Sequence, residues 1–181
     1  ADLLAPVLAG DYVEEPRLLF ASHVMRGEHA MHAALSMNDV VIARGAVAAM
    51  IEFSVSVDGD FVYTLRADGL ILATPTGSTA YALSAGGPIL HPRLSAMSIC
   101  PIAPQSLSNR PVVIPADSRV EVALVRGDAR ANFDVQSNWE LLPGDRVVTR
   151  AFERPLRLLH PTSYSYYATL RGKLHWNERH H

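Results

Sequence analysis

A strict alternation of apolar and polar residues over residues 51–65 is the feature that most constrains what this chain can fold into. Side chains two residues apart share one face of a strand, so this period predicts two half-buried strands. Asp58-Gly59 lies between them and suits the positive φ values of a tight hairpin turn. The apolar positions of the expected β-hairpin are Ile51, Phe53, Val55 and Val57 before the turn and Phe61, Tyr63 and Leu65 after it.

Further short apolar segments, separated by Gly, Pro and Asp, predict a mostly antiparallel structure of two sheets. Val120, Val122 and Leu124 indicate another strand, and Pro143-Gly144-Asp145 separates two strands expected near 131–136 and 146–152. Continuous apolar runs are typical of strands buried on both faces. Such runs lie at 18–25, 40–43, 70–73, 98–103, 112–114 and 156–159. We therefore expect a mainly β, sandwich-like fold.

Helix is expected in two places only. Residues 79–85 predict a short helix, with Ser78 as its N-cap and Gly86 in the left-handed position at its end. Residues 163–175 predict a second helical segment after Pro161, although Gly172 weakens it.

Composition excludes several classes of protein. The 181 residues carry 16 Lys and Arg against 18 Asp and Glu, a net charge of −2, which argues against a nucleic-acid partner. Hydrophobic residues make up 49% of the chain, so it should fold. The single cysteine, Cys100, excludes an internal disulfide framework and favours a reducing, cytoplasmic location. No apolar run approaches the roughly 20 residues that span a membrane. The opening at Ala1, without an initiator Met, indicates a piece of a longer protein.

The segment that best suits a ligand is the loop after the apolar run 70–73. Gly77 would let a ligand approach the backbone, and the start of the following helix would offer unpaired N–H groups. Thr76, Ser78 and Thr79 could donate hydrogen bonds to ribose or phosphate, and Tyr81 offers a flat ring face. The simpler interpretation is a turn with a capped helix.

Other motifs carry less weight. Asp68 before Gly69 and Asp39 after Asn38 are each, taken singly, more typical of turns and strand starts. Residues 82–86 resemble a weakened serine-hydrolase nucleophile elbow, but the chain shows hairpins where that fold alternates strands and helices. His29-x-x-His32 has no obvious third ligand and is interpreted as a solvated pair. No phosphate-binding Gly-x-x-x-x-Gly-Lys-Ser/Thr loop is present.

In the loop after the apolar run 70–73, the sequence closely resembles that of the bacterial NAD kinases. The signature is Asp68-Gly-Leu-Ile-Leu-Ala-Thr-Pro-Thr-Gly-Ser-Thr-Ala-Tyr81, continued by Ser84-Ala-Gly-Gly-Pro-Ile-Leu-His-Pro92. Supporting segments follow in the family's order: Asn38-Asp39, Leu107-Ser-Asn-Arg-Pro111, and Leu159-His-Pro161 with Tyr164-Ser-Tyr166. The family's Asn-Glu is Asn-Asp here, one methylene shorter.

The resemblance implies a transferase that uses ATP to phosphorylate the adenosine-ribose 2′-hydroxyl of NAD, giving NADP. It also implies Mg²⁺ or another divalent cation with the ATP, and a homodimer or homotetramer in the cytoplasm, without a membrane partner. Residues 1–181 would form the single β-rich NAD-binding domain, with about 1–16 and 160–181 joining or packing on an α/β domain. The family's Gly-Gly-Asp-Gly motif, whose Asp is the presumed base, is absent. We therefore expect no catalytic residue in this chain and no activity from it alone.

Carried over position by position, the resemblance implies a set of residues that contact NAD. Asn38 and Asp39 would hold an adenine edge or ribose hydroxyls, while Arg66 and Asp68 would meet the other end of NAD, often across a subunit interface. Gln136 depends on an alignment with a short gap. The full expected set is Asn38, Asp39, Arg66, Asp68, Thr76, Thr79, Ala80, Tyr81, Ala82, Leu83, Ser84, Ala103 and Gln136, with no metal ligand.

Two other functions compete with this one. The chain could be a non-catalytic β-rich oligomerisation module whose loop only makes turns. It could also be the substrate domain of a related lipid kinase, which shares the two-domain plan. Selective binding of NAD over lipid would distinguish an NAD kinase from a lipid kinase. A serine hydrolase would be labelled at Ser84 by a fluorophosphonate, which we do not expect.

Overall fold

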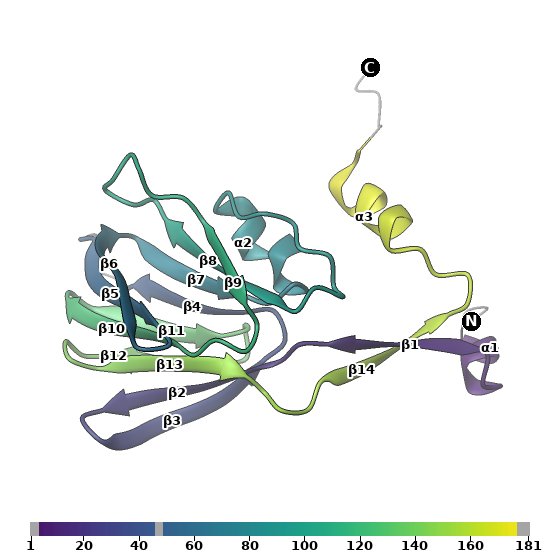
Figure 1. Ribbon diagram of the computed structural model, residues 1–181, viewed down its shortest axis with the longest axis horizontal. Helices are drawn as coiled ribbons and strands as arrows, with labels where there is room; N and C mark the ends of the chain where they lie inside the picture. The colour runs from purple at the N-terminus through teal and green to yellow at the C-terminus, as the bar shows by residue number, and fades with distance from the viewer. Residues whose placement is uncertain (1–3, 46–48, 177–181) are drawn as a thin grey trace. The chain divides into compact units, whose positions relative to one another are not determined.

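The computed structural model describes residues 4–45 and 49–176. The chain divides into two compact units, one formed by residues 17–156 and the other by the described parts of residues 1–16 and 157–181. The outermost residues of the two segments expected to meet another domain, 1–3 and 177–181, lie outside the described residues. Most of the larger unit consists of β-strands arranged in two sheets, and the predicted mainly β, two-sheet fold is confirmed (Figure 1).

The first of two six-stranded sheets, called sheet I here, has the strand order β3-β2-β13-β10-β5-β6. All its neighbouring strands run antiparallel. The predicted hairpin is β5 and β6, joined through Asp58 at φ 54° and Gly59 at φ 92°. The strands of sheet I are β2 (Phe20–Arg26), β3 (His29–Ser36), β5 (Ile51–Val57), β6 (Asp60–Ala67), β10 (Val120–Arg126) and β13 (Arg146–Ala151).

Sheet II, the other six-stranded sheet, has the order β12-β11-β4-β7-β8-β9 and is also antiparallel. Its central strands are buried on both faces, as their continuous apolar sequences predict, and β7 has no exposed residue. The strands are β4 (Asp39–Arg44), β7 (Gly69–Ala73), β8 (Ala96–Ile102), β9 (Val112–Pro115), β11 (Ala129–Phe133) and β12 (Ser137–Leu141).

The main core lies between the two sheets. Phe20, Phe53 and Phe133 are its largest fully buried side chains, and they come from both sheets. The outer face of sheet II carries a second, smaller core in which Val41, Ile71 and Cys100 pack against Ala82. Ala82 belongs to the short helix α2 (Tyr81–Ser84), which lies over β7 and β8 in Figure 1. This small core holds the loop after β7 against the sheet.

The smaller unit contains a two-stranded sheet of β1 (Tyr12–Arg17) and β14 (Leu156–Pro161), with α1 (Leu4–Leu8) and α3 (Tyr166–Leu174). The predicted second helix is therefore present over a shorter range. Ser165 is its N-cap, and the Ser165 hydroxyl accepts a hydrogen bond from the Ala168 N–H at 3.3 Å. No helix in the described ranges is both long and apolar enough to cross a bilayer.

Three strands, β1, β3 and β12, were not predicted, and the strand expected near 131–136 is β11, which lies slightly earlier in the chain. β11 ends at Phe133, and β12 begins at Ser137 after a turn in which Asp134 has φ 50°. β12 has only five residues, so the alternation of Trp139 and Leu141 with Asn138 and Glu140 is too short to predict a strand from the sequence.

The interpretation of His29 and His32 as a solvated pair is wrong for His32. Its ring stacks on Trp139, with ring centroids 5.3 Å apart, and its Nε2 lies 2.8 Å from the Ser137 hydroxyl. His29, in contrast, is exposed. Among the residues that the structure describes, no three His, Cys, Asp or Glu side chains gather as a metal site would require.

Candidate functional site

The loop singled out in the sequence lies against the start of β4. Strands β4 and β7 are antiparallel with Asp39 opposite Ala73, so the residues before β4 meet the residues after β7. The Thr74 N–H donates to the Asn38 carbonyl at 2.9 Å, and the Thr74 hydroxyl donates to the Met37 carbonyl at 2.6 Å. Two of the expected contact segments are thus joined by backbone hydrogen bonds.

Gly77 is required by this packing. A Cβ added to Gly77 would overlap the backbone of Asn38, including its carbonyl oxygen. The Gly77 N–H donates to the Thr74 hydroxyl at 3.1 Å, which closes the turn. The sequence suggested that Gly77 admits a ligand to the backbone, whereas the structure uses the missing side chain to admit Asn38.

The expected role of Ser78 is corrected. A 3-10 helix, η1 (Gly77–Thr79), precedes α2, and Ala80 is the N-cap of α2 with no side-chain capping bond. Ser78 is fully buried, its hydroxyl donates to the Pro75 carbonyl at 2.6 Å, and it accepts from the Leu90 N–H at 2.9 Å. Ser78 therefore neither caps the helix nor reaches a ligand. Gly86, at φ 80°, takes the left-handed position as predicted.

Other side chains of the loop remain accessible. Tyr81 is 47% exposed and Ser84 is also exposed, while Thr76 and Thr79 are half-buried. The Thr76 hydroxyl accepts a hydrogen bond from the buried Arg17 guanidinium at 3.3 Å. Three further members of the expected set lie nearby in the sequence: Ala80 and Leu83 are half-buried, and Ala82 is fully buried with its side chain in the outer core of sheet II.

Asp39 and Asp134 form an acidic pair beside this loop. The Asp134 carboxylate accepts hydrogen bonds from the backbone N–H groups of Met37, Asn38 and Asp39 at 2.8, 2.9 and 3.1 Å. Burial, and then the negative charge of Asp134, raise the pKa of Asp39 to about 6. Our sequence reasoning missed Asp134, although it stands two residues before the expected contact Gln136, which is exposed.

Arg66, Asp68 and Ala103 form a separate group at the opposite end of β7. The Asp68 N–H donates to the Ile102 carbonyl at 3.0 Å, and the Asp68 carboxylate pairs with Arg44 at 3.0 Å. Ala103 has a left-handed φ of 44°. Thr74 lies six positions after Asp68, which corresponds to about 20 Å along a strand. The structure therefore divides the expected contacts into a loop group and an Asp68 group.

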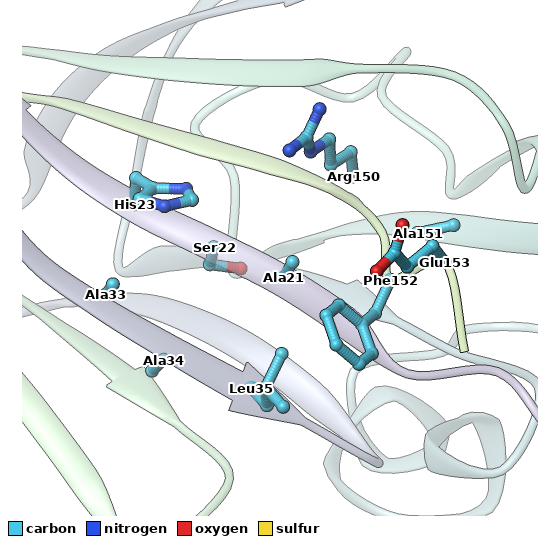
Figure 2. Close-up of a pocket in the computed structure, with 10 residues that line it drawn as sticks. All are labelled: Ala21, Ser22, His23, Ala33, Ala34, Leu35, Arg150, Ala151, Phe152 and Glu153. Carbon is cyan, nitrogen blue, oxygen red and sulfur yellow. The ribbon is translucent and has the colours of Figure 1, made fainter. Parts of the chain in front are cut away.

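A hollow of about 570 Å³ lies elsewhere, over β2, β3 and β13 of sheet I (Figure 2). Ala21 and Ala33 line the hollow with short side chains, and the larger side chains of His23, Leu35 and Arg150 also line it. None of the expected contact residues lines it.

The comparisons with known proteins identify the family. The family model described as the ATP-NAD kinase C-terminal domain matches residues 37–160. The chain belongs to this family. The match begins one residue before Asn38 and includes the loop group, the Asp68 group and Asp134.

Individual relatives agree with the family model. The chain is 57% identical to an NAD kinase of Ralstonia nicotianae over 98% of its own length and 59% of that protein. It is 52% identical to an NAD kinase of Chromobacterium violaceum over 98% of its length and 62% of that protein. The chain thus spans about three fifths of the curated relatives it matches, and the resemblance read from the sequence is confirmed.

Solved structures share the fold. A yeast NADH kinase complexed with NADH superposes with a TM-score of 0.91 at 25% identity, covering 98% of this chain and 55% of that one. An NAD kinase from Archaeoglobus fulgidus in complex with ATP superposes with a TM-score of 0.77 at 26% identity, covering 95% of this chain and 64% of that one.

Proposed function

We propose that this chain is the NAD-binding part of an NAD kinase, which transfers the γ-phosphoryl group of ATP to the 2′-hydroxyl of the adenosine ribose of NAD. The observation that carries the proposal is the loop group: a family-specific Thr-Pro-Thr-Gly-Ser-Thr-Ala-Tyr turn packed against Asn38-Asp39, with accessible hydroxyl, amide and aromatic groups beside the buried Asp39 carboxyl. Relatives named NAD kinase at up to 57% identity support it.

The side chains of the loop group suit a dinucleotide. The Asp39 carboxylate accepts hydrogen bonds from ribose hydroxyls, and the Asn38 amide both donates and accepts. Thr76 and Thr79 supply hydroxyl groups, and the exposed Tyr81 ring packs beside a planar base. Gln136 adds an exposed amide. These groups bind and orient NAD, and the base that activates its hydroxyl lies outside this chain.

The Asp68 group has a different role in this proposal. It lies about 20 Å along the strand from Thr74, so we place it against the dinucleotide bound by a neighbouring subunit. Arg66 is exposed, and the side chains of Asp68 and Arg44 are each over a third exposed despite their ion pair. A homodimer or homotetramer would bring this group to a second loop group.

The remaining parts of the proposal concern what lies around the domain. The unit of β1, β14 and α3 would join this chain to the α/β domain that carries the Gly-Gly-Asp-Gly motif. A divalent cation would accompany ATP there, and no step assigned to this chain uses one. The unpaired Cys100 supports a reducing, cytoplasmic location.

The test is calorimetric titration of NAD into this chain, with Tyr81→Ala beside it. We expect saturable binding that Tyr81→Ala weakens by about tenfold or more, since the ring loses its stacking contact. Tyr167→Ala is the matched control, because Tyr167 is also an exposed tyrosine, 60% exposed, and lies in α3 outside the loop group.

Other outcomes discriminate between functions. If the folded chain does not bind NAD, this contradicts an NAD site that works without the α/β domain and favours an oligomerisation module. Preference for lipid vesicles over NAD would favour a lipid-kinase domain. Labelling of Ser84 by a fluorophosphonate would indicate a hydrolase.

A further inference from the structure

The turn between β11 and β12 is hydrogen-bonded to residues 37–39, which lie at least 95 positions earlier in the chain. One carboxylate, that of Asp134, accepts three consecutive backbone N–H groups, from Met37, Asn38 and Asp39. The Asp134 N–H donates in return to the Asp39 carbonyl at 3.0 Å. Asp134 itself has φ 50°, which Asp and Asn adopt more readily than most residues.

The loop after β7 holds the same segment through its carbonyl groups. Thr74 donates its hydroxyl to Met37 and its N–H to Asn38. The Asp134 carboxylate therefore binds the backbone N–H groups of residues 37–39, and Thr74 binds the backbone carbonyls of Met37 and Asn38. In the described part of the chain, the Asn38 amide and the Asp39 carboxylate form no hydrogen bond of their own. The fold fixes the backbone and leaves both side chains without a hydrogen-bond partner among the described residues, Asn38 half-buried and Asp39 buried.

We propose that Asp134 is a positioning residue for the dinucleotide, whose carboxylate fixes the backbone of residues 37–39 so that the Asn38 and Asp39 side chains face NAD. This inference rests on the proposed function. Asp134 does not itself contact the dinucleotide, and it acts through Asn38 and Asp39.

A turn alone would not require this residue. Asn or Gly tolerates the same left-handed backbone without adding a negative charge beside a buried carboxyl group. Asp134 adds that charge, which contributes after burial to raising the pKa of Asp39 to about 6. Only a carboxylate has two oxygens that can both accept, as the Met37 and Asn38 N–H groups require. The geometry thus favours backbone positioning over the stability of the turn.

The experiment compares Asp134→Asn with Asp58→Asn in the 181-residue chain. Asn keeps the left-handed backbone and one accepting oxygen, but its NH₂ group opposes one of the three backbone donors. Asp58 is the matched control: it has φ 54°, its carboxylate accepts the Arg119 N–H at 2.7 Å, and it lies in the β5–β6 turn of sheet I. NAD affinity, thermal unfolding and amide hydrogen exchange are measured for each variant.

We expect Asp134→Asn to weaken NAD binding about tenfold or more, as lost hydrogen bonds to a charged group do, and Asp58→Asn to leave it unchanged. Exchange at the amides of residues 37–39 should accelerate, while exchange in the β5 core stays slow. In an Asn38→Ala background the effect of Asp134→Asn on affinity should shrink, because the side chain being positioned is gone.

Equal NAD affinity in Asp134→Asn would overturn the inference, and so would a loss that is undiminished in the Asn38→Ala background. Failure of the unmutated chain to bind NAD would instead contradict the proposed function. The exchange measurement would then still decide whether Asp134 holds the segment: unchanged exchange at residues 37–39 would overturn that role.

Discussion

At the scale of the residue, Asp39 is expected to bind the ligand, and its buried carboxylate destabilises the folded chain at neutral pH. Its pKa in the folded chain is about 6, above the ordinary 3.8, so the folded chain binds this proton more tightly than the unfolded chain does. The contribution of Asp39 to stability therefore falls as pH rises from about 4 to about 6, and the penalty is complete above that range.

Asp39→Asn should accordingly stabilise the chain at pH 7 by up to about 3 kcal/mol, since a pKa shift of one unit corresponds to about 1.4 kcal/mol and the shift from 3.8 to about 6 is about two units. The gain should vanish below about pH 4, where both states carry the proton. NAD binding should weaken, because a neutral amide replaces the accepting carboxylate. Denaturant unfolding at several pH values measures the first effect and calorimetry the second. Asp117→Asn, in an exposed turn, is the control, and a variant no more stable than the parent at pH 7 would contradict the expectation.

At the scale of the element, Ser78 ties η1 to the segment that follows α2. Its buried hydroxyl bonds the Pro75 carbonyl and the Leu90 N–H, which are fifteen positions apart. Ser78→Ala leaves both groups without this partner and should destabilise the chain by about 1–3 kcal/mol. Thermal unfolding measures this, with the exposed Ser84→Ala as control. NAD affinity should fall with Ser78→Ala although the hydroxyl never faces the ligand, and equal stability of the two variants would refute the tie.

At the scale of the whole molecule, the unit of residues 17–156 contains the main core and all the expected contact residues from Asn38 to Gln136. A chain of residues 17–156 should therefore unfold cooperatively and bind NAD with an affinity within about threefold of the 181-residue chain, a difference below about 0.7 kcal/mol. Circular dichroism and calorimetry measure these properties. A truncated chain that is unfolded, or that binds far more weakly, would show that the β1–β14 unit is needed by the larger one.

Much of this molecule follows from the sequence by itself. The alternation at residues 51–65 predicted the β5–β6 hairpin, and the apolar runs predicted the buried strands β4 and β7, because side-chain period is a local property. The signature loop and its family could also be recognised, since both are written in consecutive residues. Strand β12 was not predicted, because the alternation of Trp139 and Leu141 with Asn138 and Glu140 is short and only pairing with β11 distinguishes it from the preceding turn.

Only the tertiary structure decided which residues support the site and which form it. Ser78 looked like a cap and a ligand donor, and its burial under Leu90 removed both roles. Asp134 lay inside a strand expected near 131–136 and had no assigned role, and it became part of the site only when antiparallel pairing of β4 with β11 brought it to Asn38 and Asp39. Sequence determines the local period and the chemistry of each side chain. Which distant groups share a hydrogen bond depends on how the strands pair.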